Sequence, residues 1–249
     1  MVFFPHKRME KTYIEIAGLT VEINHEYPNV RHHCGDYLAD ASSACDIIAR
    51  ASDEQIDRES IESERVNGHP FSRGYVEDVC LYRSIAEQLP HFDAFVFHGA
   101  AVNIDGEGFI FTAPSGTGKT THIKLLMENY PNRVSIINGD KPIIRFFPDG
   151  VYVCSTPWAG KEDMKQNTRS KLRGICIVRR GKSNSIRRIE PSAFFGEIIH
   201  QVYLPIGSDA SEKTFDLMNI LGARVNFYLL ECNISPEAAQ TSFGELSKS

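Results

Sequence analysis

Residues 109–121 have the sequence FIFTAPSGTGKTT. The first four residues predict a short apolar strand, and the lysine and threonines at the end predict the start of a helix. Between them, Gly116 and Gly118 can take backbone angles that are barred to other residues, so successive N–H groups can converge on an anion. The stretch therefore predicts a phosphate-binding loop between a strand and a helix.

The loop follows the Walker A pattern G-x-x-x-x-G-K-[ST], except that Ala113 stands where the first glycine belongs. Lys119 would neutralise the β- and γ-phosphates of a nucleotide, and the Thr120 hydroxyl would bind Mg²⁺. The helix adds unpaired N–H groups and the positive end of its dipole. A glycine-rich surface turn is the alternative, but the apolar strand and the amphipathic helix beside the loop disfavour it. The predicted ATP contacts are Ser115, Gly116, Thr117, Gly118, Lys119, Thr120 and Thr121.

A second apolar strand is predicted over residues 134–140, and it ends in the carboxylate of Asp140. A Mg²⁺-nucleotide site requires an acid next to the phosphate loop, either to hold the water shell of the metal or to accept a proton from the substrate. The alternative is an aspartate that only shapes the turn after Gly139. We favour the functional interpretation and predict Thr120 and Asp140 as the metal contacts.

Composition narrows the possible classes of protein. The chain has 249 residues, 42% of them apolar, and a net charge of -5 without a sustained basic run, which disfavours nucleic-acid binding. Its length allows one large domain, or one domain with an N-terminal lobe. No apolar stretch approaches the ~20 residues of a membrane-spanning helix, so we expect a cytoplasmic protein without a membrane partner. The six scattered cysteines suit reduced, buried thiols.

The first part of the chain predicts a small sheet and two helices. Two strands around Gly18, a strand at 47–49 and a helix at 52–65 capped by Ser52 are expected. A second helix would pack on the sheet that follows it through one apolar face. That predicted face consists of Tyr75, Val79, Tyr82, Ala86 and Leu89.

From residue 92 onward, strands predominate. Several of them precede the phosphate loop, unlike the alternating strand and helix order of the commonest P-loop folds. The loop at 155–162 holds the only tryptophan, Trp158, which would either cover a ligand or pack as a structural aromatic. The predicted strands are 94–97, 100–104, 109–112, 134–140, 142–146, 151–154, 171–180, 185–189 and 225–230, and the predicted helices after the loop helix begin at Pro191, Thr214 and Pro236.

Four segments together carry a resemblance to a known group of enzymes: HGAAV at 98–102, the Asp105-Gly106 turn, the loop, and Asn138-Gly139-Asp140. They look like the HPr serine kinase/phosphorylase and ATP-dependent phosphoenolpyruvate carboxykinase superfamily. The resemblance implies an α/β fold of mixed α+β character, with mixed central sheets and an N-terminal accessory lobe. Residues 1–91 would form the lobe and residues 92–249 the P-loop kinase-like domain.

The resemblance also implies roles for single residues. Lys119 and Thr120 would contact phosphate and Mg²⁺, Asp140 would face the metal and the transferred phosphoryl group, and His98 would face the site. The superfamily usually has two adjacent aspartates where this chain has Gly139-Asp140, which leaves open whether Asp140 is a metal ligand, a general base or both. The downstream arginine motif of the superfamily is not recognisable here, and Lys161 is the candidate that replaces it.

Carboxykinases are much longer and carry further metal-binding and oxaloacetate-binding residues that have no counterpart here. We therefore expect a kinase that uses ATP and Mg²⁺ to phosphorylate a hydroxyl group, with Asp140, His98 and Lys161 as its catalytic residues. The acceptor would be a serine of a protein or peptide, or a small molecule. A catalytically impaired nucleotide-binding regulator is the alternative, because the second acid is missing. The sequence leaves open a reverse phosphorylase activity and the oligomeric state, a homo-oligomer included.

Overall fold

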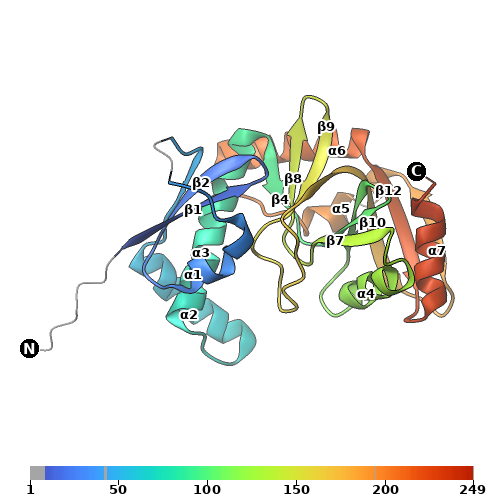
Figure 1. Ribbon diagram of the computed structural model, residues 1–249, viewed down its shortest axis with the longest axis horizontal. Coiled ribbons are helices and arrows are strands. Elements are labelled where there is room, and N and C mark those ends of the chain that lie inside the picture. The colour runs from blue at the N-terminus through green and yellow to red at the C-terminus, as the bar shows by residue number, and fades with distance from the viewer. Residues whose placement is uncertain (1–8, 42–43, 194, 249) are drawn as a thin grey trace, which may run out of the picture. The chain divides into compact units, whose positions relative to one another are not determined.

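The computed structural model describes residues 9–41, 44–193 and 195–248, and the chain forms two compact units, Met1–Gln88 and Leu89–Ser249 (Figure 1). Phe194, part of the helix predicted to begin at Pro191, lies outside the described residues. Within them, none of the helices combines the length and the apolar character needed to cross a membrane.

The first unit contains a three-stranded sheet in the order β1-β2-β3. β1 and β2 form the predicted antiparallel hairpin, and β3 lies parallel to β2. Ser52 caps α2 with a reciprocal pair of hydrogen bonds to Gln55, as the sequence predicts. The elements are β1 Glu10–Ile16, β2 Leu19–His25, α1 Asn29–His33, η1 Gly35–Tyr37, β3 Ile47–Ala49, α2 Asp53–Asn67 and α3 Arg73–Gln88.

The face predicted for the second helix, α3, is confirmed at Ala86 and Leu89, which are buried, but it is wrong at Tyr75. Tyr75 is 47% exposed and stacks on Phe71, whereas the buried side of the helix includes Val76, Cys80 and Leu81. Val76 and Cys80 form a small core with Ile56 of α2. Within its own unit, α3 therefore packs on elements that precede it, including α2 and β3.

The second unit contains a nine-stranded mixed sheet. Seven of its strands follow the order β4-β8-β9-β10-β6-β5-β7, and the other two are β12, which pairs with β10, and β11, which pairs with β12. The first three residues of β10 pair antiparallel with β9, and from Gly174 onward the strand pairs parallel with β12. This arrangement confirms the predicted α/β class with mixed sheets. The elements up to β9 are η2 Leu89–Phe92, β4 Ala94–Val96, β5 Ala100–Ile104, β6 Glu107–Thr112, α4 Lys119–Asn129, β7 Val134–Asn138, β8 Ile143–Phe147 and β9 Gly150–Cys154. Those after it are β10 Arg169–Arg180, β11 Ser185–Ile189, η3 Pro191–Ala193, α5 Phe195–Ile199, α6 Ser208–Arg224, β12 Asn226–Cys232 and α7 Pro236–Leu246.

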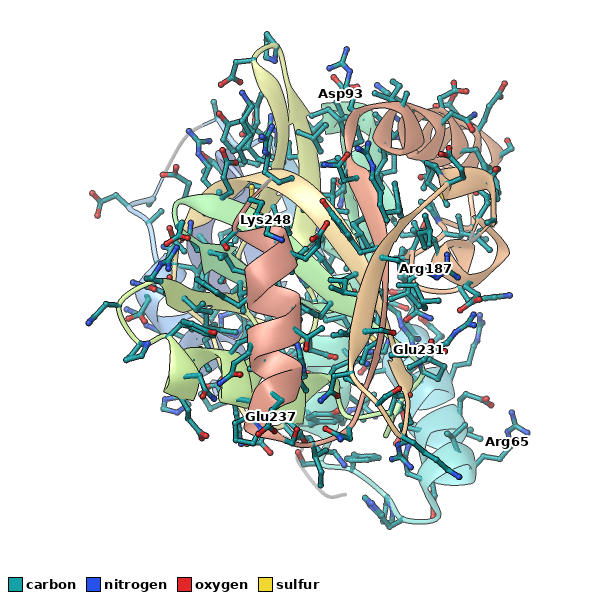
Figure 2. The ribbon with its side chains drawn as sticks, turned by 90° about the vertical axis from the view of Figure 1, so that its right-hand side faces the viewer. Arg65, Asp93, Arg187, Glu231, Glu237 and Lys248 are labelled. Atoms are coloured by element: carbon teal, nitrogen blue, oxygen red, sulfur yellow. The ribbon has the colours of Figure 1, made fainter. Side chains whose placement is uncertain are left out.

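Alternating side chains of the central strands pack in two separate cores, one on each face of the sheet. Ile110, Ile175 and Leu229 pack with residues of α5 and α6, whereas Phe111 and Cys176 pack with residues of α4 and α7. Figure 1 shows α4 and α7 side by side, and Figure 2 shows α7, between Glu237 and Lys248, next to the strands that carry Arg187 and Glu231. The sheet is thus covered by helices on both faces.

Strand directions bring three chain segments to the same edge of the sheet. β5 runs antiparallel to both β6 and β7, so these two strands point the same way, and β10 is parallel to β6. The carboxyl ends of β6, β7 and β10 therefore lie at one edge. The phosphate loop follows the end of β6, Asp140 follows the end of β7, and Arg180 is the last residue of β10.

Candidate functional site

The loop after β6 has the backbone that its glycines predict. Gly116 and Gly118 have φ of 76° and 119°, in the left-handed region that favours glycine, and α4 begins at the next residue, Lys119. The N–H and the hydroxyl of Thr117 both donate to the carbonyl oxygen of Pro114, at 3.2 and 2.7 Å. Ser115 and Gly116 are exposed, so the tip of the loop is open to a ligand.

Lys119 folds back over the start of the loop. Its Nζ donates to the carbonyl oxygen of Ala113 at 2.9 Å. Burial lowers the pKa of the Lys119 ammonium, with the charge of Asp140 opposing this effect and that of Lys141 adding to it. The loop lysine and the predicted acid therefore lie within each other's electrostatic reach.

Asp140 lies between two basic side chains. His98 Nε2 is 3.2 Å from Oδ1 of the carboxylate, and Lys141 Nζ is 3.4 Å from Oδ2. Burial on its own raises the pKa of Asp140, but the hydrogen bond from His98 and the charge of Lys141 outweigh it, so the pKa lies below its ordinary value. The carboxylate is therefore ionised at neutral pH, and its side chain is 30% exposed.

The turn that carries Asp140 is fixed by Asn138, the fully buried last residue of β7. Its Oδ1 accepts the N–H groups of Asp140 and Lys141 at 2.9 and 2.8 Å, and its Nδ2 donates to the carbonyl oxygen of Thr156 at 2.9 Å. From the β5 side, the Gly99 N–H donates to the carbonyl oxygen of Asp140 at 3.0 Å. The acid is thus held on both sides by backbone hydrogen bonds.

Two glycines allow the loop after β9 to pack closely against this turn. A Cβ at Gly160 would lie 2.9 Å from Cβ of Asp140, and a Cβ at Gly139 would lie 2.9 Å from the carbonyl oxygen of Ala159. The space that a side chain at position 139 would need is therefore filled by neighbouring backbone. This chain has room for one acid in the turn.

The loop after β9 also carries Trp158 and Lys161. Trp158 is only 8% exposed, which favours the structural alternative. Lys161 is exposed and lies between Gly160, where an added Cβ would meet Asp140, and Glu162, whose carboxylate binds Lys124 of α4 at 2.7 Å. In the part of the chain that the structure describes, no ion pair joins Lys161 to Asp140.

Three residues at this edge of the sheet were not among the predicted site residues. Lys141 and Asn138 contact or position Asp140, as described above. Arg180, the last residue of β10, donates from Nη2 to the carbonyl oxygen of Gly116 at 2.5 Å and from Nε to that of Thr117 at 3.2 Å. Lys141 and Asn138 adjoin Asp140 in sequence, but nothing in the sequence points from Arg180 to a loop sixty residues earlier.

The candidate metal contacts are few. Thr120 is half-buried in the first turn of α4, and Thr121 beside it is exposed. Among the described residues, histidine, cysteine, aspartate and glutamate side chains form no group of three that could hold a metal ion. The hydroxyl of Thr120 and the carboxylate of Asp140 are hard oxygen donors, which suit Mg²⁺, an ion that keeps several waters and takes other ligands from phosphates.

Comparison with solved structures finds the HPr(Ser) kinase/phosphatase from Coxiella burnetii, with a TM-score of 0.40 and 10% sequence identity. The alignment covers 61% of this chain and 88% of that chain. No family model and no curated protein matches the sequence. At this score the similarity carries no argument about activity, and the α/β fold with mixed sheets rests on the strand order described above.

Proposed function

We propose that this protein is an ATP- and Mg²⁺-dependent kinase that transfers a phosphoryl group to a hydroxyl group. The observation that supports this most is the convergence of a glycine-containing loop, its lysine and an ionised acid at one edge of the sheet. Phosphoryl transfer requires little more than a cradle for the phosphates, positive charge and a positioned acceptor. These are the features that the edge offers.

In this proposal the loop binds the phosphates of ATP. N–H groups of residues 115–121 other than that of Thr117, which binds Pro114, would face the phosphate oxygens at the N-terminus of α4, because the positive end of the helix dipole lies there. Lys119 and Lys141 add two ammonium groups in the field of Asp140. Positive charge fixed in place stabilises the negative charge that spreads over the transferred group in the transition state.

A bound Mg²⁺ would supply neutralising charge between the phosphates, held by the Thr120 hydroxyl and the Asp140 carboxylate. Asp140 would also accept the proton of the acceptor hydroxyl. The oxygen of that hydroxyl would form a bond to the γ-phosphorus, while the bond between this phosphorus and the leaving β-phosphate oxygen breaks. Because the pKa of Asp140 is low, it is a weak base, which suits a reaction dominated by positioning. His98 would fix the direction of the carboxylate through its hydrogen bond to Oδ1.

Lys119→Ala and Asp140→Asn test the proposal, with Lys213→Ala as a charge-matched control on α6, where Lys213 pairs with Asp93. We expect Lys119→Ala to abolish binding of ADP, measured by calorimetry, and Lys213→Ala to leave it unchanged. Asp140→Asn should bind ADP but lose transfer from radiolabelled ATP to hydroxyl acceptors or water. Binding that does not depend on Lys119, or full transfer by Asp140→Asn, would contradict the proposal.

A nucleotide-binding regulator is the second candidate, and one feature of the site favours it. Both oxygens of Asp140 contact basic side chains, and the turn has no space for a further acid. Under this alternative the wild-type protein binds ATP through Lys119 but transfers nothing to seryl peptides, small alcohols or water. The transfer assay therefore separates the two candidates directly.

A further inference from the structure

β10 extends past the end of β6 and reaches the phosphate loop. The parallel register pairs Ile177 with Thr112, the last residue of β6, so three further residues of β10 run beside the loop. The last of them, Arg180, pairs with Cys232 of β12, and the following Gly181 N–H donates to the Cys232 carbonyl oxygen at 2.9 Å. Arg180 therefore reaches the loop from a backbone that the sheet holds in place.

The guanidinium of Arg180 binds two successive carbonyl groups of the loop, those of Gly116 and Thr117, at 2.5 and 3.2 Å. In a planar trans peptide the carbonyl of one residue and the N–H of the next point to opposite sides. The two contacts therefore set the directions of the N–H groups of Thr117 and Gly118. The Thr117 N–H donates to the Pro114 carbonyl oxygen and closes the turn, and the Gly118 N–H lies directly before Lys119.

Arg179 provides an internal contrast. Successive residues of a strand point to opposite faces of a sheet, and Arg179 binds Glu197 of α5 at 2.5 Å. Both arginines are exposed and have the same charge, but Arg180 binds carbonyl groups of the loop whereas Arg179 binds Glu197. A general loss of positive charge can therefore be separated from the loss of the loop contacts.

We propose that Arg180 is a positioning residue that orients the peptide groups of the phosphate loop before a nucleotide binds. This inference rests on the proposed nucleotide binding at the loop. Because Arg180 acts through the main chain, it supports every phosphate that the loop holds, and ADP and ATP depend on it equally. A planar fork with several donors is required, since two carbonyl groups are bound at once.

The test uses the full chain with Arg180→Ala, Arg180→Lys and, as the control, Arg179→Ala. Arg180→Ala should weaken ADP and ATP binding by the same factor, about tenfold for the loss of two hydrogen bonds. Arg180→Lys should recover only part of this loss, and Arg179→Ala should bind like the wild type. In the protein without nucleotide, hydrogen exchange of the loop amides should be faster in Arg180→Ala than in Arg179→Ala.

Unchanged exchange and unchanged binding in Arg180→Ala would overturn the inference. So would a loss confined to ATP, because that result would indicate a direct contact with the γ-phosphate. If the wild-type protein binds no nucleotide, the proposed function fails on its own. Faster loop exchange in Arg180→Ala would in that case still support the positioning role.

Discussion

At the scale of single residues, the surroundings of Asp140 are set by small side chains as much as by charged ones. Gly139 and Gly160 let the loop after β9 approach the turn, and Asn138 fixes the backbone on either side of the acid. The result is one carboxylate between His98 and Lys141. The single acid is therefore a consequence of how this loop packs.

Introducing a second acid by Gly139→Asp should destabilise the protein. The new Cβ would lie 2.9 Å from the Ala159 carbonyl oxygen, and overpacking of this kind costs about 1–3 kcal/mol. Gly196→Asp is the matched control, because a Cβ at Gly196 meets nothing within 4 Å. Thermal unfolding should show a lower midpoint for Gly139→Asp than for Gly196→Asp. Equal midpoints would mean that the loop can move away without cost.

Gly160→Ala should move the Asp140 carboxylate away from its basic partners. The added methyl would lie 2.9 Å from Cβ of Asp140. We expect the pKa of Asp140 to rise above its wild-type value, as measured by carboxyl carbon NMR titration with Asp140→Asn for assignment. Gly68→Ala is the control, since Gly68 has the same φ of 76° with nothing within 4 Å and incurs the same backbone strain of about 1–2 kcal/mol. An unchanged pKa in Gly160→Ala would refute the coupling.

The sequence predicts part of this site because the residue type and its local pattern indicate a chemical role. The loop pattern identifies Lys119, and an acid at the end of an apolar strand identifies Asp140. The structure places both residues at one edge of the sheet. Their roles remain predictions. Arg180 could not be found in this way, because its partners are main-chain carbonyl groups brought to it by the register of β10 and β6.

At the scale of elements, periodicity predicted most strands and helices but not the orientation of α3. Apolar residues lie on more than one side of that helix, and the set that includes Tyr75 matches the spacing as well as the set that includes Val76. The burial of Val76 and Cys80 depends on Ile56 of α2, a contact between two helices that a pattern within one helix does not reveal.

The contact between α4 and α7 contains a buried histidine, His122. Its Nε2 is 2.9 Å from Oγ of Ser242, whose hydroxyl also lies within reach of the Ala238 and Ala239 carbonyl oxygens. A neutral ring that donates from Nε2 to Ser242 leaves that hydroxyl free to donate to α7. Nδ1 faces the thiol of Cys232 at 4.0 Å, so a second proton would place a charge in an apolar contact.

Burial lowers the pKa of His122 from 6.5 to about 4, so the contact between α4 and α7 should weaken in mild acid. Between these two values the unfolded chain binds a proton that the folded chain does not. The contribution of neutral His122 to the free energy of unfolding is therefore complete above about pH 6.5. It decreases towards pH 4, by at most about 1.4 kcal/mol per pH unit.

Urea unfolding of wild type, His122→Gln and His200→Gln between pH 7.5 and 4.5 measures this effect. Carboxylates titrate in all three proteins, so the difference between their curves isolates His122. His122→Gln should lose less stability on acidification than the wild type, and the exposed His200→Gln should follow the wild type. Parallel curves for all three would show that the folded protein accepts the proton at His122.

At the scale of the whole molecule, the order of strands in the sheet is the feature that the sequence reveals least. β10 and β11 are joined by residues 181–184, but β12 lies between them and pairs parallel with one and antiparallel with the other. β10 also exchanges β9 for β12 along its length. Such pairings connect segments far apart in the chain, and local patterns do not encode them.

Two core clusters lie wholly within residues 95–246, on the two faces of the sheet, so we expect a fragment of residues 89–249 to fold on its own. Its size is that of an ordinary domain, and all strands and helices around the loop belong to it. The fragment should show a cooperative urea transition by circular dichroism and bind ADP with the affinity of the full chain. Lys119→Ala should abolish ADP binding in the fragment and in the full chain. A fragment that folds but binds nothing would show that the first unit is needed for the site, and a fragment without a cooperative transition would show that the two units fold as one.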